Sequence, residues 1–460
     1  MKDSRLRKQT VNLQQKLRQS NIAGFLSVST GILLVASAGG WDITNHLLNK
    51  PESFFSPPHA ALYSGVALVI IGTILIYQCQ ARFRDQESNS KDHSRQRMKA
   101  VVNASGLSSL QLSVKLIYLG TTMLVSSGPF DYMWHTAFGL DGLLSPPHAL
   151  LTVGMAFCST GALIGILSSS RSLVNGNKNS VASFQISKIK GIIINDSTIP
   201  DNSRKRKISY SSPYRPAYHP VFVIIGILPV WLTLSGFIHL ATLPFSDTPF
   251  FNFNLDPIVA VVIATICFPF LVSFILFSSF RLCVRQNDNL ISAPRSVKIN
   301  KAMPFGILTI IGITFIVVNI LTSILPNEYL IPTLPFYMIN ILPLVAADML
   351  LVKGSVINHN QNSSGKRENK QYANYLAGAI LGLGFFTFYF PLITHTYNEA
   401  LPNSEPVWPS LTGLIYFDMI GKISVFLISP AIIMGICGVV ISSLILDRRE
   451  TQRITMPELT

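Results

Sequence analysis

The stretch NIAGFLSVSTGILLVASAGG, residues 21–40, contains no charged side chain and is long enough to cross the hydrocarbon core of a bilayer as one helix. Of the 460 residues in the chain, 49% are hydrophobic and only 13% are charged. An ordinary soluble domain has about 25% charged residues. Composition and run length therefore exclude an ordinary soluble protein, and they predict an all-α polytopic membrane protein.

Nine further apolar runs follow the first, so we expect about ten transmembrane helices. The predicted spans are 21–40, 58–79, 108–128, 147–169, 220–242, 257–281, 303–325, 331–353, 373–396 and 420–446. The first span follows a charged head and lacks a convincing small-residue cleavage site. We therefore expect it to be retained rather than removed as a signal peptide.

The charged residues are unevenly distributed along the chain. The 36 Lys and Arg exceed the 22 Asp and Glu, which gives a net charge of +14. Nearly all the basic residues lie in six segments, 1–20, 80–107, 170–219, 282–302, 354–372 and 447–460, whereas the alternate loops contain a single basic residue, Lys50. The positive-inside rule then places both termini in the cytoplasm and the five short loops outside the cell membrane.

The basic charge thus sets orientation, and the partner that it predicts is the lipid bilayer rather than nucleic acid. The longest basic loop also divides the chain. We expect a four-span domain at 1–170, a basic cytoplasmic linker at 171–219 and a six-span domain at 220–460. In the last domain Asp348, five residues before Lys353, is expected to reach the cytoplasmic interface.

One hairpin occurs twice in the front half. The first copy reads GGWDITNHLLNKPESFFSPPHAALYSG at residues 39–65, and the second reads GPFDYMWHTAFGLDGLLSPPHALLTVG at residues 128–154. At a constant offset of 89 residues, each copy has the form Asp-x3-His-x12-His. The repeated polar residues are Asp42, His46 and His59 in the first copy and Asp131, His135 and His148 in the second.

The spacing of these residues suits a metal site. An Asp and a His four residues apart lie one turn apart on the same face of a helix. The sequence Ser-Pro-Pro that precedes the last His is a typical helix start, with Ser as N-cap and Pro in the first turn. One carboxylate and two imidazoles can then converge from two adjacent helices. A polar hydrogen-bond network at the same place is the alternative.

Three protein ligands leave coordination positions open, as in catalytic metal sites. Two imidazoles and one carboxylate suit copper(II), zinc(II) or non-haem iron(II). The two copies have the same orientation and could pack about an axis along the membrane normal, either as two mononuclear sites or as one two-metal centre.

The second copy also resembles a known motif. Asp131-x-x-Trp134-His135, followed after twelve residues by His148 in Ser-Pro-Pro-His, is similar to the metal motif of the C subunit of copper membrane monooxygenases, the family of particulate methane and ammonia monooxygenases. The resemblance implies copper ligands at Asp131, His135 and His148, and by repeat at the corresponding residues of the first copy. It also implies other membrane subunits as partners. The chain departs from the motif at Asn45, where the family has Trp.

Three functions follow from these observations. The first is an oxidoreductase-like subunit, related to the monooxygenase C subunit, that uses copper, or else zinc or iron, on a small-molecule substrate. The second is a transporter or carrier that captures a transition-metal ion at the outer sites. The third is a structural or assembly subunit, in a complex or a homo-oligomer, whose polar motif orders the outer hairpins.

Overall fold

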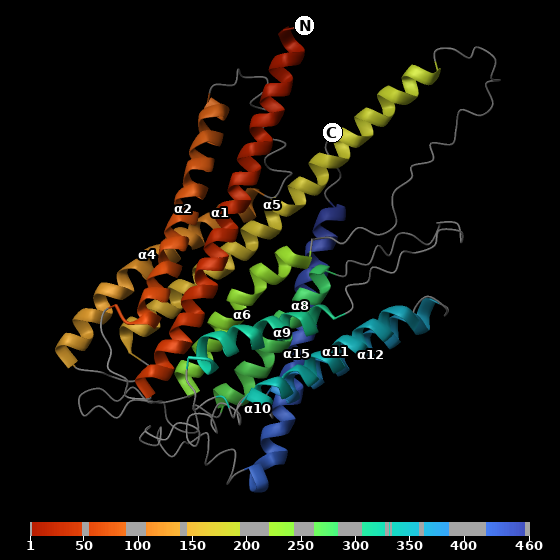
Figure 1. The fold of residues 1–460 in the computed structure, drawn as a ribbon. Coiled ribbons are helices and arrows are strands. Elements are labelled where there is room, and N and C mark those ends of the chain that lie inside the picture. The colour runs from red at the N-terminus through yellow and green to blue at the C-terminus, as the bar shows by residue number, and fades with distance from the viewer. Residues whose placement is uncertain are drawn as a thin grey trace.

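The computed structural model describes residues 2–47, 55–88, 107–138, 145–193, 220–242, 262–283, 306–326, 331, 334–357, 363–385 and 420–455. Within these ranges the regular secondary structure is entirely helical (Figure 1). The helices of the front half are α1 (Lys2–Leu47), α2 (Pro57–Ser88), α4 (Leu107–Phe138) and α5 (Pro146–Ile193). The back half has α6 (Pro220–Thr242), α8 (Phe268–Cys283), α9 (Ile307–Asn319), α10 (Leu334–Ile339), α11 (Ile341–Ile357), α12 (Ser363–Gly384) and α15 (Ile420–Thr455).

Within the described residues, six helical segments are long and apolar enough to cross a membrane. They are Gln19–Asp42, Pro57–Arg82, Pro146–Ser169, Val221–Ile238, Thr265–Cys283 and Phe426–Asp447. Two shorter apolar helices cover Ile307–Thr322 and Ile341–Leu351. The predicted span 108–128 lies in α4, which is not among the six, and the predicted span 373–396 begins in α12 and continues outside the described residues. The fold fits the multi-pass all-α membrane protein that the composition predicts, while the number of ten spans stays a prediction.

Each repeat folds as a pair of antiparallel helices that cross at glycine. A Cβ atom on Gly31 would lie 2.7 Å from the carbonyl oxygen of Gly65, and one on Gly65 would lie 2.8 Å from that of Gly31. Gly120 and Gly154, at the offset of 89 residues, make the same approach between α4 and α5, at 2.6 and 3.0 Å. Small residues allow such close contact of helix backbones in membranes. The repeat therefore extends from the Asp/His motif to the crossing point of each hairpin.

The two hairpins pack against each other on equivalent helices. The hydroxyls of Thr73 in α2 and Thr121 in α4 are hydrogen-bonded at 3.0 Å. On the other side of the bundle, the Phe25 ring of α1 lies directly over Gly165 of α5. Exchanging the hairpins turns the α2–α4 contact into the α5–α1 contact, so the two hairpins take corresponding places in the bundle. Both motif-bearing turns consequently lie at the same end of the bundle.

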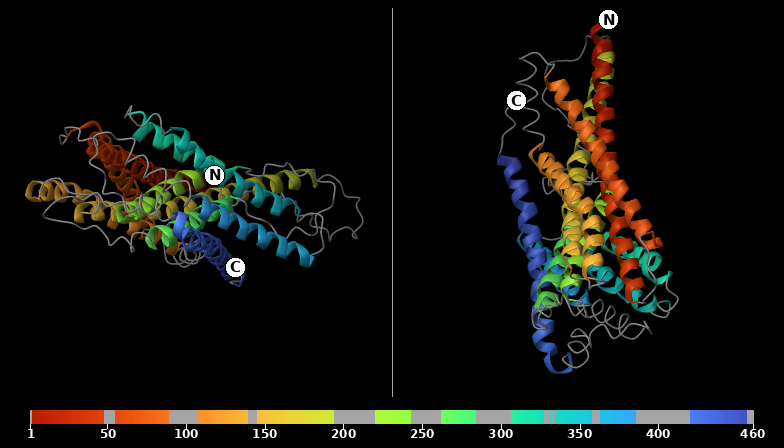
Figure 2. Two further views of the ribbon diagram at one scale, coloured as in Figure 1. Left: turned by 90° about the horizontal axis from the view of Figure 1, so that it is seen from below. Right: turned by 90° about the vertical axis from the view of Figure 1, so that its left-hand side faces the viewer.

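The hydrophobic interior forms two clusters that follow the two halves of the chain. In Figures 1 and 2 the red-to-orange helices gather on one side, with the green-to-blue helices beside them. The back cluster is built around Trp231, which stacks on Phe315 at 4.6 Å between ring centroids and meets Phe385 edge-on at 5.6 Å. The halves are joined by contacts such as the hydroxyl of Ser29, which donates to the carbonyl oxygen of Ile225 at 2.7 Å. Helix α5 continues to Ile193, inside the segment predicted as a linker, and the boundaries at 170 and 219 remain predictions.

Asp348 is buried against α9, and its place at the cytoplasmic interface stays a prediction. Its side chain is only 1% exposed, and it caps the first turn of α9. One carboxylate oxygen accepts from the N–H and the hydroxyl of Thr309, at 2.8 and 2.7 Å, and the other accepts from the N–H of Leu308 at 3.3 Å. The first N–H groups of a helix have no partner within it, so a carboxylate supplied by a neighbouring helix satisfies them.

Candidate metal centre

The returning helix of each hairpin begins at the Ser-Pro-Pro-His sequence, as predicted. In the second copy α5 begins at Pro146, and the N–H of Ala149 donates to the carbonyl oxygen of Ser145 at 2.9 Å. In the first copy α2 begins at Pro57 with the same backbone bond, but among the described residues Oγ of Ser56 makes no hydrogen bond, so the predicted side-chain cap is absent there. Proline suits the first turn because its missing N–H would have no partner there. His59 and His148 are thus each the third residue of their helix, beside the end of the helix that precedes it.

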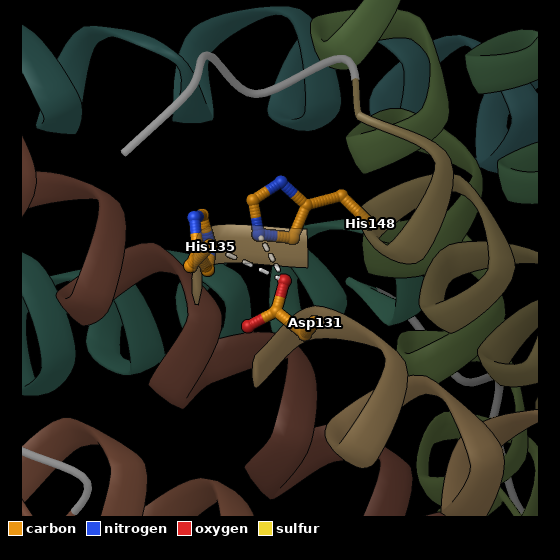
Figure 3. A group of neighbouring side chains, drawn as sticks. All are labelled: Asp131, His135 and His148. Atoms are coloured by element: carbon orange, nitrogen blue, oxygen red, sulfur yellow. Dashed lines mark ion pairs between the residues drawn. The ribbon is translucent and has the colours of Figure 1, made fainter. Parts of the chain in front are cut away.

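The second copy brings all three of its polar side chains together. Asp131 and His135 lie one turn apart near the end of α4, which continues through Pro129, and His148 comes from the first turn of α5 (Figure 3). The Asp131 Oδ1 atom lies 3.4 Å from Nε2 of His135 and 3.5 Å from Nε2 of His148. The three potential ligand atoms lie within 4.8 Å of one another. The side chains are 23–37% exposed, so an ion could reach them from solvent.

These distances fit a coordination sphere. Nitrogen and oxygen ligands bind zinc-like ions at about 2.0–2.2 Å, so the edges of a tetrahedral site measure roughly 3.3–3.6 Å. The two measured separations, 3.4 and 3.5 Å, fall in that range. A charge-assisted N–H···O bond is shorter, at about 2.7–2.9 Å. The Asp131 separations are therefore compatible with a metal site, and the Asp131–His135 pair also fits a hydrogen bond.

The Asp131 carboxyl lies beyond the predicted span 108–128 and is held in its charged form. Burial raises its pKa, but the hydrogen bond with His135 and the charges of His148 and His135 lower it by more, so the pKa lies below its ordinary value. The charge of Asp42, from the other copy, acts on the Asp131 carboxyl in the opposite direction. The carboxylates of the two copies are thus within electrostatic range of each other.

The first copy repeats the central contact. Oδ1 of Asp42 lies 3.1 Å from Nε2 of His59, and both side chains are partly buried, at 16% and 24% exposed. The same two atom types meet in the second copy between the residues 89 positions later. His46 lies in α1 one turn after Asp42, but its side chain falls outside the described residues. The Tyr63 ring of α2 lies beside this contact, with its centroid 6.2 Å from the centroid of the His59 ring.

The sequence alone did not identify two further polar side chains of the first copy. Asn45 and Ser56 are 9% and 8% exposed, and they lie beside the Asp42–His59 contact along the chain. Their only signal in the sequence was the replacement of Trp134 of the second copy by a polar amide. A serine precedes the returning helix in both copies, so Ser56 gave no separate signal.

Comparison of this chain with known protein families, with curated proteins and with solved structures finds no match. The geometry of the site and its local motif are therefore the observations that bear on function.

Proposed function

We propose that this chain is a multi-pass membrane protein that binds transition-metal ions at the outer ends of its two repeated hairpins. The observation that carries the proposal is the convergence of Asp131, His135 and His148, whose potential ligand atoms lie within 4.8 Å of one another. By repeat, Asp42, His46 and His59 would form the second set of ligands.

Copper is the metal that we propose, because the second copy resembles the metal motif of copper monooxygenase C subunits. When bound, copper supplies one-electron redox chemistry and can coordinate small molecules. The three protein side chains leave coordination positions open for water or a small substrate. Asp131 contributes a negative charge, which neutralises part of the charge of a divalent ion, and the two imidazoles contribute neutral nitrogen ligands.

The proposed setting is the cell membrane, with ten spans, both termini in the cytoplasm and the metal sites outside. The outer loops contain one basic residue, Lys50, so they offer little repulsion to an incoming cation. In this setting the chain would act as an oxidoreductase-like component beside other membrane subunits, as the motif resemblance implies. An epitope at the N-terminus that is cut by protease added to intact cells would contradict this orientation.

Metal analysis of the purified full-length protein tests the proposal. We expect copper at a fixed ratio to protein, with an electron paramagnetic resonance signal typical of nitrogen and oxygen ligands. The His59→Ala plus His148→Ala variant should lose it, and His93→Ala, which changes a histidine outside both motifs, should retain it. Trace metal that the double variant leaves unchanged would overturn the proposal. Metal uptake into cells that depends on His46 would favour a transporter instead.

A further inference from the structure

The two copies differ in the residues that lie one turn outside the Asp–His contact. In α1 the residue before the second ligand is Asn45, whereas in α4 it is Trp134. The residue before the returning helix is serine in both copies, Ser56 and Ser145, but the two serines have different environments. These differences give the two sites different surroundings although their proposed ligands are the same.

In the second copy both side chains have partners within the same hairpin. The Trp134 ring packs against Phe138 at 4.6 Å and against Phe130 at 6.1 Å between ring centroids. The Oγ atom of Ser145 accepts a hydrogen bond from the N–H of His148 at 3.4 Å. Aromatic packing and a helix cap therefore account for both residues.

In the first copy the corresponding polar atoms are buried without a partner. Asn45 is 9% exposed and Ser56 is 8% exposed. Among the described residues, neither Oδ1 of Asn45 nor Oγ of Ser56 makes a hydrogen bond. Leaving a buried polar atom unsatisfied destabilises a protein, and buried polar groups are for this reason nearly always paired with protein or with a bound molecule. Two such atoms beside one proposed metal site point to a bound molecule.

The antiparallel hairpin places the two residues at a similar level. Asn45 follows Asp42 by three residues in α1, and Ser56 precedes His59 by three residues at the start of α2. Because the helices are antiparallel, both residues are displaced from the Asp42–His59 contact in the same direction, by roughly one helical turn. A small molecule bound at that level would lie beside both residues and the proposed metal.

We propose that Asn45 and Ser56 bind the exogenous ligand of the first metal site, a small neutral molecule that carries an N–H or O–H donor. The amide oxygen of Asn45 can only accept a hydrogen bond, so it selects a donor and disfavours an anion. The hydroxyl of Ser56 can donate or accept. The second copy lacks both free groups, so the two sites differ in ligand selectivity. This inference depends on the proposed metal binding at Asp42, His46 and His59.

A pair of matched probes tests the selectivity. Imidazole and 1-methylimidazole coordinate metals through the same type of nitrogen, but only imidazole retains an N–H donor. The full-length protein with His135→Ala and His148→Ala carries the first site alone, and its content of copper(II) is measured first. Each probe is then titrated and followed by the electron paramagnetic resonance spectrum of copper.

We expect imidazole to bind more tightly than 1-methylimidazole. Asn45→Leu, which keeps the shape of the side chain, should weaken imidazole binding about tenfold, the effect of one lost hydrogen bond, and leave 1-methylimidazole binding unchanged. Ser56→Ala should weaken imidazole binding several-fold and provides a second test if the Leu variant does not fold. As a matched control, Trp134→Leu should not change the ratio of the two affinities in a protein that carries only the second site.

Three results would overturn the inference. They are equal affinity for the two probes, no binding of either probe, and imidazole affinity that both Asn45→Leu and Ser56→Ala leave unchanged. A preference that arises only from steric exclusion of the methyl group would give the last result. Absence of copper from the protein that carries only the first site would also overturn the proposed function for that copy, and the metal measurement identifies this failure before any probe is added.

Discussion

The two hairpin copies share their backbone crossing and their carboxylate–imidazole contact, but they differ one turn farther out. Gly31 and Gly120 have the same close approach to the neighbouring helix, and Asp42 and Asp131 meet the returning histidine through the same atoms. Outside that level the first copy has an unpartnered amide oxygen where the second has a packed indole. The residues that the two copies share are those proposed to hold the metal. The residues that differ are those proposed to bind the ligand of the metal.

Two single variants, each lacking one histidine of one copy, are the strongest test of whether the sites are separate. We expect His148→Ala to weaken metal binding in the second copy more than about 100-fold, because loss of an outer-sphere partner alone weakens it 10–100-fold. The first copy should keep its metal. His59→Ala should have the reciprocal effect. Competition titration with a chelator would measure the affinity and the number of ions bound per chain.

If either single variant abolished all metal binding, the two copies would form one centre. That result would be compatible with the electrostatic interaction between the Asp42 and Asp131 carboxylates. It would contradict the assignment of two separate metal sites. His93→Ala, which leaves both motifs intact, controls for general loss of metal during purification.

The shared helix crossing predicts the next largest effect. Gly120→Ala places a Cβ atom 2.6 Å from the carbonyl oxygen of Gly154, so the helices must move apart, and we expect a loss of about 1–3 kcal/mol in the free energy of unfolding. Gly31→Ala should have a similar effect in the first copy. Gly128→Ala, in the same helix as Gly120, meets nothing within 4 Å and should be neutral or slightly stabilising. Unfolding in detergent would measure all three variants, and equal effects at Gly120 and Gly128 would contradict the shared crossing.

Much of this arrangement could be predicted from the sequence, because it depends on regular spacing. Apolar runs of about 20 residues locate membrane helices whatever packs around them. The constant offset between the copies predicted that the same hairpin occurs twice. The Ser-Pro-Pro sequence predicted where each returning helix begins. The contact between Asp131 and His148 follows from these local rules.

The remaining features depend on which helices become neighbours, and spacing does not determine that. The contact of Asp348 with the first turn of α9 was not predicted, because it depends on the packing of α11 against α9. Asn45 was recognised only as a departure from Trp. Its burial depends on what packs around the end of α1, which the sequence pattern does not describe.

A moderate effect is expected where the hairpins meet. Thr73 and Thr121 share one hydrogen bond between α2 and α4, and interhelical hydrogen bonds in membrane proteins contribute about 0.6 kcal/mol on average. Thr73→Val and Thr121→Val should each destabilise the protein, and the double variant should be less destabilised than the sum of the two. The difference, measured in a double-mutant cycle, gives the coupling energy. Strictly additive effects would mean that this bond does not hold the two copies together.

The smallest expected difference lies at the start of the returning helices. Ser145→Ala removes a cap whose hydrogen bond is long, at 3.4 Å, so the loss should be about 0.5 kcal/mol, the low end of the range for helix caps. Ser56→Ala removes no hydrogen bond among the described residues, so the free energy of unfolding should change less than it does in the Ser145 variant. If Ser56→Ala lowered the free energy of unfolding as much as Ser145→Ala does, Ser56 would act as a helix cap like Ser145. The first site would then lose one of the two groups proposed to bind its ligand. A smaller loss of stability in Ser56→Ala, together with weaker imidazole binding, would mean that the two equivalent serines have different roles. Ser145 would stabilise a helix, and Ser56 would bind a ligand.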